Sequence, residues 1–283
     1  MTVIDGPVAL VASRVRVEEK RLMDALDRRA VRYQHVDPRT LWHRAEDGAR
    51  WGLALNREIA HSRALAVART LEAQGSTVFN SATTTEVCGD KWRSTLALRA
   101  AGLPVPRTAL GLTPEAALDA LDAIGYPAVI KPLQGSWGRL VSLVPDRQVA
   151  ETLLEYVAAL PAPQARLVYV QEFVDKPGRD IRVLVVGGRA IAATYRTGSG
   201  LRTNVARGAQ SLPCPVTEDV AGLATAAAKA VGGDVTGVDL IETRAGDLLV
   251  LEVNDRVEFA GLQAALGDTV DVASHIVDLV VRG

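Results

Sequence analysis

The chain has 283 residues, of which 48% are hydrophobic and 23% charged, and its formal net charge is −1. This composition is typical of a globular protein with a substantial core and two or three subdomains. The near-neutral charge, the lack of a basic run and an aromatic content of 4% argue against nucleic-acid binding. Cys88 and Cys214 are too few for a disulfide framework or a structural zinc site, which fits a reducing cytoplasm. The short apolar run near the start, followed by charges, predicts neither a signal peptide nor a membrane span. We therefore expect a cytoplasmic enzyme without a membrane or nucleic-acid partner.

The first part of the chain predicts a small α/β domain that ends near residue 88. Apolar runs and helical spacing predict a strand, a helix and a second strand over residues 8–12, 18–29 and 32–37. No G-x-G-x-x-G turn follows the first strand, which argues against a dinucleotide site. We expect a long helix over 57–74, then a strand over 76–80 and a polar connector over 81–89.

The middle part predicts helices around a glycine-rich strand–loop–strand unit. Asp90 is a candidate N-cap for a helix that ends at Gly102, with Lys91 in its first turn. The helix dipole disfavours a lysine there unless an anion binds, although a solvated lysine is the simpler reading. Helices over 114–124 and 147–160 flank strand, loop and strand within 128–144.

The last part predicts two hairpins separated by a polar loop and a helix. A strand over 166–174 and a Gly-Gly hairpin over 181–195 precede the polar segment 196–211, whose length favours a functional loop. A helix over 217–231, a second hairpin and a helix over 270–281 follow. We divide the chain into residues 1–88, 89–166 and 167–283.

The second hairpin, within residues 237–259, carries the most specific acidic pattern. Folding it symmetrically about Ala245 and Gly246 places Ile241 opposite Val250 and Asp239 opposite Glu252. Side chains alternate between faces, so Asp239, Glu252 and Asn254 share one face. Two opposed carboxylates repel unless a cation such as Mg²⁺ lies between them. The alternative is a solvent-facing acidic stripe on an ordinary hairpin.

Two further segments favour nucleotide binding. The loop 134–139 joins two strands, which excludes a Walker A loop, but its glycines would let backbone N–H groups approach phosphates. Lys131 ends the preceding strand close to this loop. Residues 171–174 end an apolar strand with mixed polarity, which suits contacts to a purine and a ribose. A tight turn and an ordinary strand edge are the respective alternatives.

In combination, these motifs resemble the ATP-grasp ligases over essentially the whole chain, with an α/β fold and an N-terminal pre-ATP-grasp domain. The motifs occur in the family's order: Lys91, VIKP at 129–132, GSWGR at 135–139, QEFV at 171–174, DIRVLVVGG at 180–188, RTNVARG at 202–208 and GVDLIE…LEVN at 237–254. Residues 56–75, TNVARGAQ, VTGVDLIE and LEVNDRVEF are most similar to the RimK/LysX-type branch. The resemblance implies an N-terminal pre-ATP-grasp domain, a central subdomain with a glycine flap, and a C-terminal subdomain with the Mg²⁺ and substrate sites.

The resemblance also implies roles for individual residues. ATP and two Mg²⁺ ions would be bound. Lys91 and Lys131 would contact the phosphates, and the flap over residues 135–139 would close over them. The strand 171–174 would hold adenine, and Glu172 or a neighbouring acid would bind the ribose. Arg196 would lie over the transferred phosphoryl group, and Asn204 and Arg207 would meet the acyl phosphate. The implied ATP-binding residues are Lys91, Lys131, Gly135, Ser136, Trp137, Gly138, Arg139, Gln171, Glu172, Phe173, Val174, Asp180 and Arg182. The implied metal ligands are Asp239, Glu252 and Asn254, and the implied substrate residues are Arg256, Glu258 and Phe259.

The implied activity is ADP-forming ligation of a carboxylate to an amine through an acyl phosphate. The partners would be a 2-aminoadipate-like or glutamate-like amino acid and the C-terminal glutamate of a small acidic amino-group carrier protein (LysW-like). The family reads close to His-Thr-Met-Glu-Phe after the metal asparagine, whereas this chain has Asp-Arg-Val-Glu-Phe. We therefore expect Arg256 to face an altered or acidic substrate, unless it is a surface arginine. A RimK-like glutamate or peptide ligase and a non-catalytic nucleotide-binding module remain alternatives, and the resemblance suggests a homodimer or homotetramer.

Overall fold

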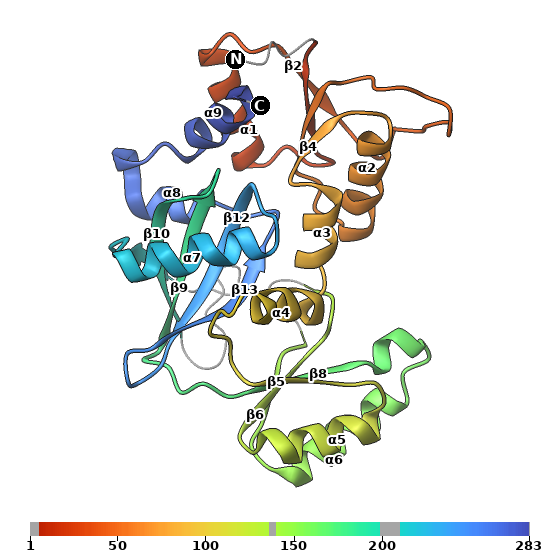
Figure 1. The fold of residues 1–283 in the computed structure, drawn as a ribbon, viewed down its shortest axis with the longest axis vertical. Coiled ribbons are helices and arrows are strands. Elements are labelled where there is room, and N and C mark those ends of the chain that lie inside the picture. The colour runs from red at the N-terminus through yellow and green to blue at the C-terminus, as the bar shows by residue number, and fades with distance from the viewer. Residues whose placement is uncertain (1–5, 136–139, 199–209, 283) are drawn as a thin grey trace.

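The computed structural model describes residues 6–135, 140–198 and 210–282, and it folds into three sheets arranged along the long axis of the molecule (Figure 1). The parallel N-terminal sheet has the order β2-β1-β3-β4. Its elements are β1 Val8–Val11, α1 Val17–Arg28, β2 Tyr33–Val36, β3 Leu53–Asn56, α2 His61–Ala73, β4 Thr77–Phe79 and α3 Ala82–Cys88. This confirms the predicted α/β layer domain.

Two predictions for this domain were wrong in detail. Residues 53–56 form the buried strand β3, so the helix expected from residue 57 begins at His61. The expected polar connector is the helix α3, because the Ser81 hydroxyl accepts a hydrogen bond from the Thr84 N–H and caps it. A four-residue strand and a threonine-rich helix carry little periodicity from which to predict them.

The central sheet is antiparallel, with the order β5-β8-β6-β7, and α5 and α6 pack together beside it (Figure 1). Its elements are α4 Lys91–Ala100, β5 Thr108–Gly111, α5 Pro114–Ile124, β6 Ala128–Lys131, β7 Ser142–Val144, α6 Arg147–Ala158, the 3₁₀ turn Pro163–Arg166 and β8 Val168–Glu172. Asp90 caps α4, as predicted, by accepting from the N–H groups of Trp92 and Arg93. The division expected at residue 166 would assign β8 to the C-terminal part, but β8 pairs with β5 and β6 and belongs to the central sheet.

The C-terminal sheet is antiparallel with the order β11-β10-β9-β12-β13, and α7 covers one face (Figure 1). Its elements are β9 Arg179–Val186, β10 Arg189–Thr197, β11 Gln210–Pro213, α7 Glu218–Ala230, β12 Val235–Glu242, β13 Leu248–Asn254, α8 Ala260–Leu266, the 3₁₀ turn Gly267–Thr269 and α9 Val272–Arg282. The predicted Gly187-Gly188 turn is confirmed, and both glycines have positive φ (+55° and +72°), as a tight hairpin turn requires. Within the described residues, no helix combines the length and the apolar character needed to cross a bilayer.

The N-terminal domain is fixed against the C-terminal sheet by a shared core. Leu10, Leu22, Leu184, Phe259 and Ile276 belong to one apolar cluster, so β1, α1, β9, the segment after β13 and α9 pack together. At the edge of this contact, the buried Asn80 side chain bonds to the backbone of residues 234, 235 and 255 at 2.6–2.9 Å. The loop that follows β13 is therefore held between the two domains.

Candidate active site

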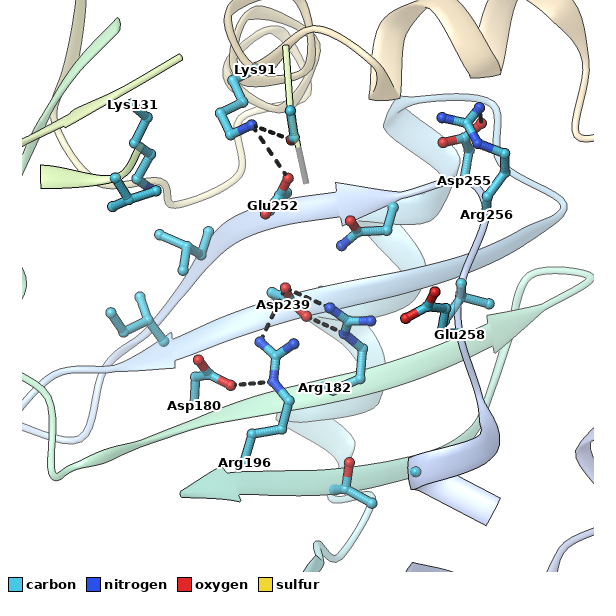
Figure 2. Close-up of a pocket in the computed structure, with 18 of the residues that line it drawn as sticks. Lys91, Lys131, Asp180, Arg182, Arg196, Asp239, Glu252, Asp255, Arg256 and Glu258 are labelled. Carbon is cyan, nitrogen blue, oxygen red and sulfur yellow. Dashed lines mark hydrogen bonds and ion pairs between the residues drawn. The ribbon is translucent and has the colours of Figure 1, made fainter. Parts of the chain in front are cut away.

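A pocket of about 480 Å³ lies where the three sheets meet. Lys131 and residues 171–174 of the central sheet line one end of the pocket. The C-terminal sheet forms the floor. The N-terminal domain and residues 255–258 line the other end, called the far end below. Figure 2 shows this division: Lys91 and Lys131 lie on one side, Asp239 with its arginines on the floor, and Asp255, Arg256 and Glu258 at the far end. The predicted residues that line the pocket are Lys91, Lys131, Gly135, Gln171, Glu172, Phe173, Val174, Asp180, Arg182, Arg196, Asp239, Glu252, Asn254, Arg256 and Glu258.

The floor carries a line of alternating charges built by strand register. Arg196 lies opposite Asp180, and Arg182 opposite Asp239, in directly paired positions of β10, β9 and β12. Arg196 donates from Nε to Asp180 at 2.6 Å and lies 3.1 Å from Asp239 through Nη2. Arg182 donates to both oxygens of Asp239 (Figure 2). Burial would raise the pKa of Asp239, but Arg182 and Arg196 outweigh it and lower the pKa. Asp239 is therefore an anion at neutral pH.

The acidic hairpin pairs as predicted at its centre, with Asp239 opposite Glu252. The expected pairing of Ile241 with Val250 was wrong, because β13 bulges at Leu251 and Ile241 pairs with Leu249. An extra residue in one strand turns neighbouring side chains to the same side. As a result both Leu251 and Glu252 line the pocket.

The two lysines approach this acidic floor from two different elements, α4 and β6. Lys91, in the first turn of α4, has its ammonium 3.8 Å from Glu252 and donates to the Gly135 carbonyl at 3.0 Å. Lys131, at the end of β6, donates to Gln171 Oε1 at 2.6 Å. Burial lowers the pKa of Lys131 to about 8, although Glu252 opposes this shift. Two cations at one end of a pocket whose floor is acidic suit a polyphosphate bound with a divalent ion.

The expected ribose contact, Glu172, is held at the end of β8. It accepts from the Arg107 backbone N–H at 2.8 Å and from Arg107 Nε at 2.7 Å. Its side chain stays about one quarter exposed, so it can still accept from a ligand hydroxyl. Phe173 and Val174 follow directly and line the same end of the pocket.

The loop after β13 contributes residues 255–258 to the pocket and Phe259 to the core. Arg256 bonds to Asp255 at 2.5 Å, and Glu258 bonds to Arg16 of the N-terminal domain at 2.9 Å. Burial raises the pKa of Asp255 against the lowering effect of Arg256. Phe259, expected at the substrate, is fully buried in the core and does not line the pocket. The sequence alone could not separate these positions, because the loop has no periodicity.

Several pocket residues were missed by the sequence reasoning, chiefly in the N-terminal domain. Arg16, Glu18, Arg57 and Ile59 line the far end, and Lys176 lies 3.4 Å from Asp180. The available sequence signal was a set of charged residues near the starts of the helices predicted over 18–29 and 57–74. The predicted residues Ser136, Trp137, Gly138, Arg139, Asn204 and Arg207 lie outside the described part of the chain.

The donors on the floor fit a hard divalent cation completed by phosphate. Asp239 and Glu252 offer carboxylate oxygens. Asn254 donates through Nδ2 to the Gly237 carbonyl, so the Oδ1 atom of Asn254 is left as a possible ligand. Magnesium in proteins commonly takes one or two carboxylates together with substrate phosphates. Within the described ranges, no group of three or more His, Cys, Asp or Glu side chains forms a self-sufficient metal site.

Comparison with known proteins gives the same picture along the whole chain. A model of the RimK-like ATP-grasp domain matches residues 88–280, and one of the LysX preATP-grasp domain matches residues 8–87. The glutamate–LysW ligase ArgX of Sulfolobus acidocaldarius is 32% identical over 96% of this chain and 97% of its own. The alpha-aminoadipate–LysW ligase LysX of the same organism is 35% identical over 72% of this chain and 75% of its own. Among solved structures, a RimK domain ATP-grasp protein from Sphaerobacter thermophilus superposes with a TM-score of 0.82 at 29% identity, over 97% of this chain and 99% of its own.

Proposed function

The chain belongs to the RimK-like ATP-grasp ligases, and from this premise we propose that it attaches an amino acid to the C-terminal glutamate of a small acidic carrier protein. The names of two relatives support LysW, or a protein like it, as the acceptor and point to glutamate or 2-aminoadipate as the amino substrate. The observation that carries the proposal is the convergence of two lysines, two opposed carboxylates and two arginines in one pocket beside a LysX-type N-terminal domain. ATP-grasp enzymes use ATP and typically Mg²⁺, so these ligands are expected here.

The reaction needs activation of a carboxylate, because oxide is a poor leaving group at neutral pH. An oxygen of the acceptor carboxylate attacks the γ-phosphorus of ATP, ADP leaves, and an acyl phosphate forms. The amine then attacks the acyl carbon, and phosphate departs with the original carboxylate oxygen. Catalysis is mainly positioning and charge neutralisation.

In this proposal each part of the pocket has a task. Lys91, Lys131 and the segment 135–139 bind phosphates, residues 171–174 bind adenine, and Glu172 binds ribose. Asp239, Glu252 and Asn254 hold two Mg²⁺ ions, which neutralise charge on the phosphates. Arg182 fixes Asp239, and Asp180 fixes Arg196. Arg196 faces the transferred phosphoryl group. Asn204 and Arg207 face the acyl phosphate. Arg256 and Glu258 face the amino substrate.

The acceptor is tested by intact-mass measurement. Small acidic proteins that end in glutamate, encoded near this chain's gene, are incubated with the protein, ATP, Mg²⁺ and single amino acids. The proposal predicts a mass gain of one amino acid less water, matched by one ADP. Mass gains on free glutamate or on peptides alone would favour a RimK-like peptide ligase instead. Nucleotide binding without amine-dependent ADP release would indicate a non-catalytic module.

We expect a homodimer or homotetramer in solution, measurable by light scattering, and a cytoplasmic protein.

A further inference from the structure

Arg57 lies at the far end of the pocket, where the N-terminal domain meets the loop after β13. It follows β3 directly, lines the pocket and is only 4% exposed. The ring of Phe259 lies 5.9 Å from its guanidinium carbon, so an aromatic face supports one side of the group. This contact gives Phe259, which does not reach the pocket, an indirect influence on it.

The guanidinium of Arg57 is only partly paired. Its Nε donates to Glu19 Oε1 at 3.1 Å, and within the described residues its buried Nη2 has no hydrogen-bond partner. Glu19 is fully buried and also binds Arg16 through Nε and Nη2, both at 2.9 Å. Two arginines thus share one buried carboxylate. Arg16 gains a second acid, Glu258, whereas among the described residues Arg57 pairs with Glu19 alone.

A buried donor of a charged group without a partner is costly and calls for an explanation. In the described ranges, six buried side-chain atoms lack a partner, and they belong to His43, Arg57, His61, Arg63, Gln74 and Thr236. Of these residues only Arg57 lines the pocket. Arg57 is therefore the residue of this set beside which a ligand in the pocket lies.

We propose that Arg57 binds a carboxylate of the amino substrate. This inference rests on the proposed function and names the residue that recognises the incoming amino acid. A guanidinium held by Nε presents its terminal nitrogens to a planar anion, which suits a carboxylate. The same end of the pocket holds the acids Glu18 and Glu258, so the amino group of the same molecule also finds partners there. Polyphosphate would instead meet these acids unfavourably and has Lys91 and Lys131 at the opposite end.

The test measures amino-acid binding by calorimetry with Mg²⁺ and a non-hydrolysable ATP analogue present. The probes are L-glutamate, L-2-aminoadipate, L-glutamine and L-isoglutamine, because the two amides remove the distal and the α-carboxylate separately. Arg57→Met is expected to weaken binding of at least one of the two acids by roughly 10- to 100-fold, the range of a charge-assisted hydrogen bond. The amide that lacks the recognised carboxylate should bind the unmodified protein and Arg57→Met equally.

Two variants make the result specific. Arg63→Met is the control, because Arg63 lies on the same segment, pairs with Glu58 and also has a buried unpaired nitrogen, but does not line the pocket. It should leave amino-acid binding unchanged. If Arg57→Met does not fold, Arg57→Lys keeps the positive charge but lacks the fork and should still weaken binding severalfold. Affinity for the ATP analogue should stay within twofold in all folded variants.

The inference is wrong if the unmodified protein binds neither acid, or if the Arg57 variants bind the acids as tightly as it does. It is also wrong if Arg57→Met weakens the acids and both amides alike, which would indicate general damage to the pocket. Failure of the proposed function has a different signature: no carrier-dependent ADP release, whatever the calorimetry shows.

Discussion

Asp239 and Glu252 lie directly opposite each other on β12 and β13, yet their surroundings differ. Asp239 is 4% exposed and bonds to Arg182 and Arg196, while Glu252 has a side chain about one third exposed and faces Lys91 at 3.8 Å. The first carboxylate is thus part of the folded framework as well as a candidate metal ligand. The second is free to act mainly on the ligand.

This difference predicts separable effects of two matched substitutions. Glu252→Gln should lower kcat by roughly 100-fold or more by removing a metal ligand, with little change in the free energy of unfolding. Asp239→Asn should lose activity and also about 3–5 kcal/mol of stability, because the partly buried Arg182 loses its acid and the buried Arg196 keeps only Asp180. Turnover at varied Mg²⁺ and urea unfolding measure these effects. Equal stability of the two variants would contradict the assignment.

The pKa of Lys131 predicts a pH dependence of ATP binding. Burial lowers this pKa to about 8, so the ammonium loses its proton as the pH rises through that value. ATP affinity should therefore fall above pH 8, because neutral lysine no longer attracts phosphate. Lys131→Arg should bind ATP with a flat profile from pH 7 to 9, since arginine stays charged. A falling profile that persists in this variant would assign the titration to another group.

The same shift has a consequence for stability in the absence of ATP. Between pH 8 and the unperturbed value of 10.5, the unfolded chain holds a proton on Lys131 that the folded protein lacks. The contribution of Lys131 to the free energy of unfolding should therefore rise with pH over this window. Below pH 8 Lys131 is charged in both states, so the buried charge lowers the free energy of unfolding by its full amount. Urea unfolding of the unmodified protein and Lys131→Met at pH 7.5 and 9.5 measures it. Loss of the buried charge should make the unmodified protein gain stability relative to Lys131→Met between pH 7.5 and pH 9.5, measured as the difference in their free energies of unfolding.

Arg256 is predicted to select the amino substrate. Arg256→Ala should raise KM for the preferred amino acid roughly tenfold and leave KM for ATP unchanged, because Arg256 lies at the end of the pocket away from Lys131. The substitution also leaves Asp255 buried without its 2.5 Å partner. The double variant Asp255→Asn/Arg256→Ala controls for this effect on folding. An unchanged KM for every amino substrate would show that Arg256 only neutralises Asp255.

Glu172 is predicted to read the ribose hydroxyls. Glu172→Gln should raise KM for ATP several-fold and reduce the preference for ATP over 2′,3′-dideoxy-ATP, because the carboxylate would accept from those hydroxyls. Arg107→Ala serves as a comparison, since it removes the guanidinium that holds Glu172 but leaves the carboxylate. The role is excluded if Glu172→Gln keeps the full preference for ATP.

Local sequence patterns predicted much of the fold, because helix caps, turn residues and alternating side chains act over a few residues of the chain. The Asp90 cap, the Gly187-Gly188 turn and the pairing of Asp239 with Glu252 all follow from short-range chemistry. The bulge at Leu251 was missed because no turn residue marks it. The site's far end was missed for another reason: Arg16 and Arg57 reach the pocket only through the packing of α1 and α9 and through Asn80, which are long-range contacts.

The most direct test of the central claim follows an oxygen atom. A carrier whose C-terminal glutamate carries ¹⁸O in all four oxygens of its two carboxylates is incubated with the protein, ATP, Mg²⁺ and the amino substrate, and the released phosphate is analysed by mass spectrometry. An acyl phosphate formed on either carboxylate of that glutamate predicts one ¹⁸O atom in each phosphate and one amide per ADP. Amide formation with unlabelled phosphate would contradict it.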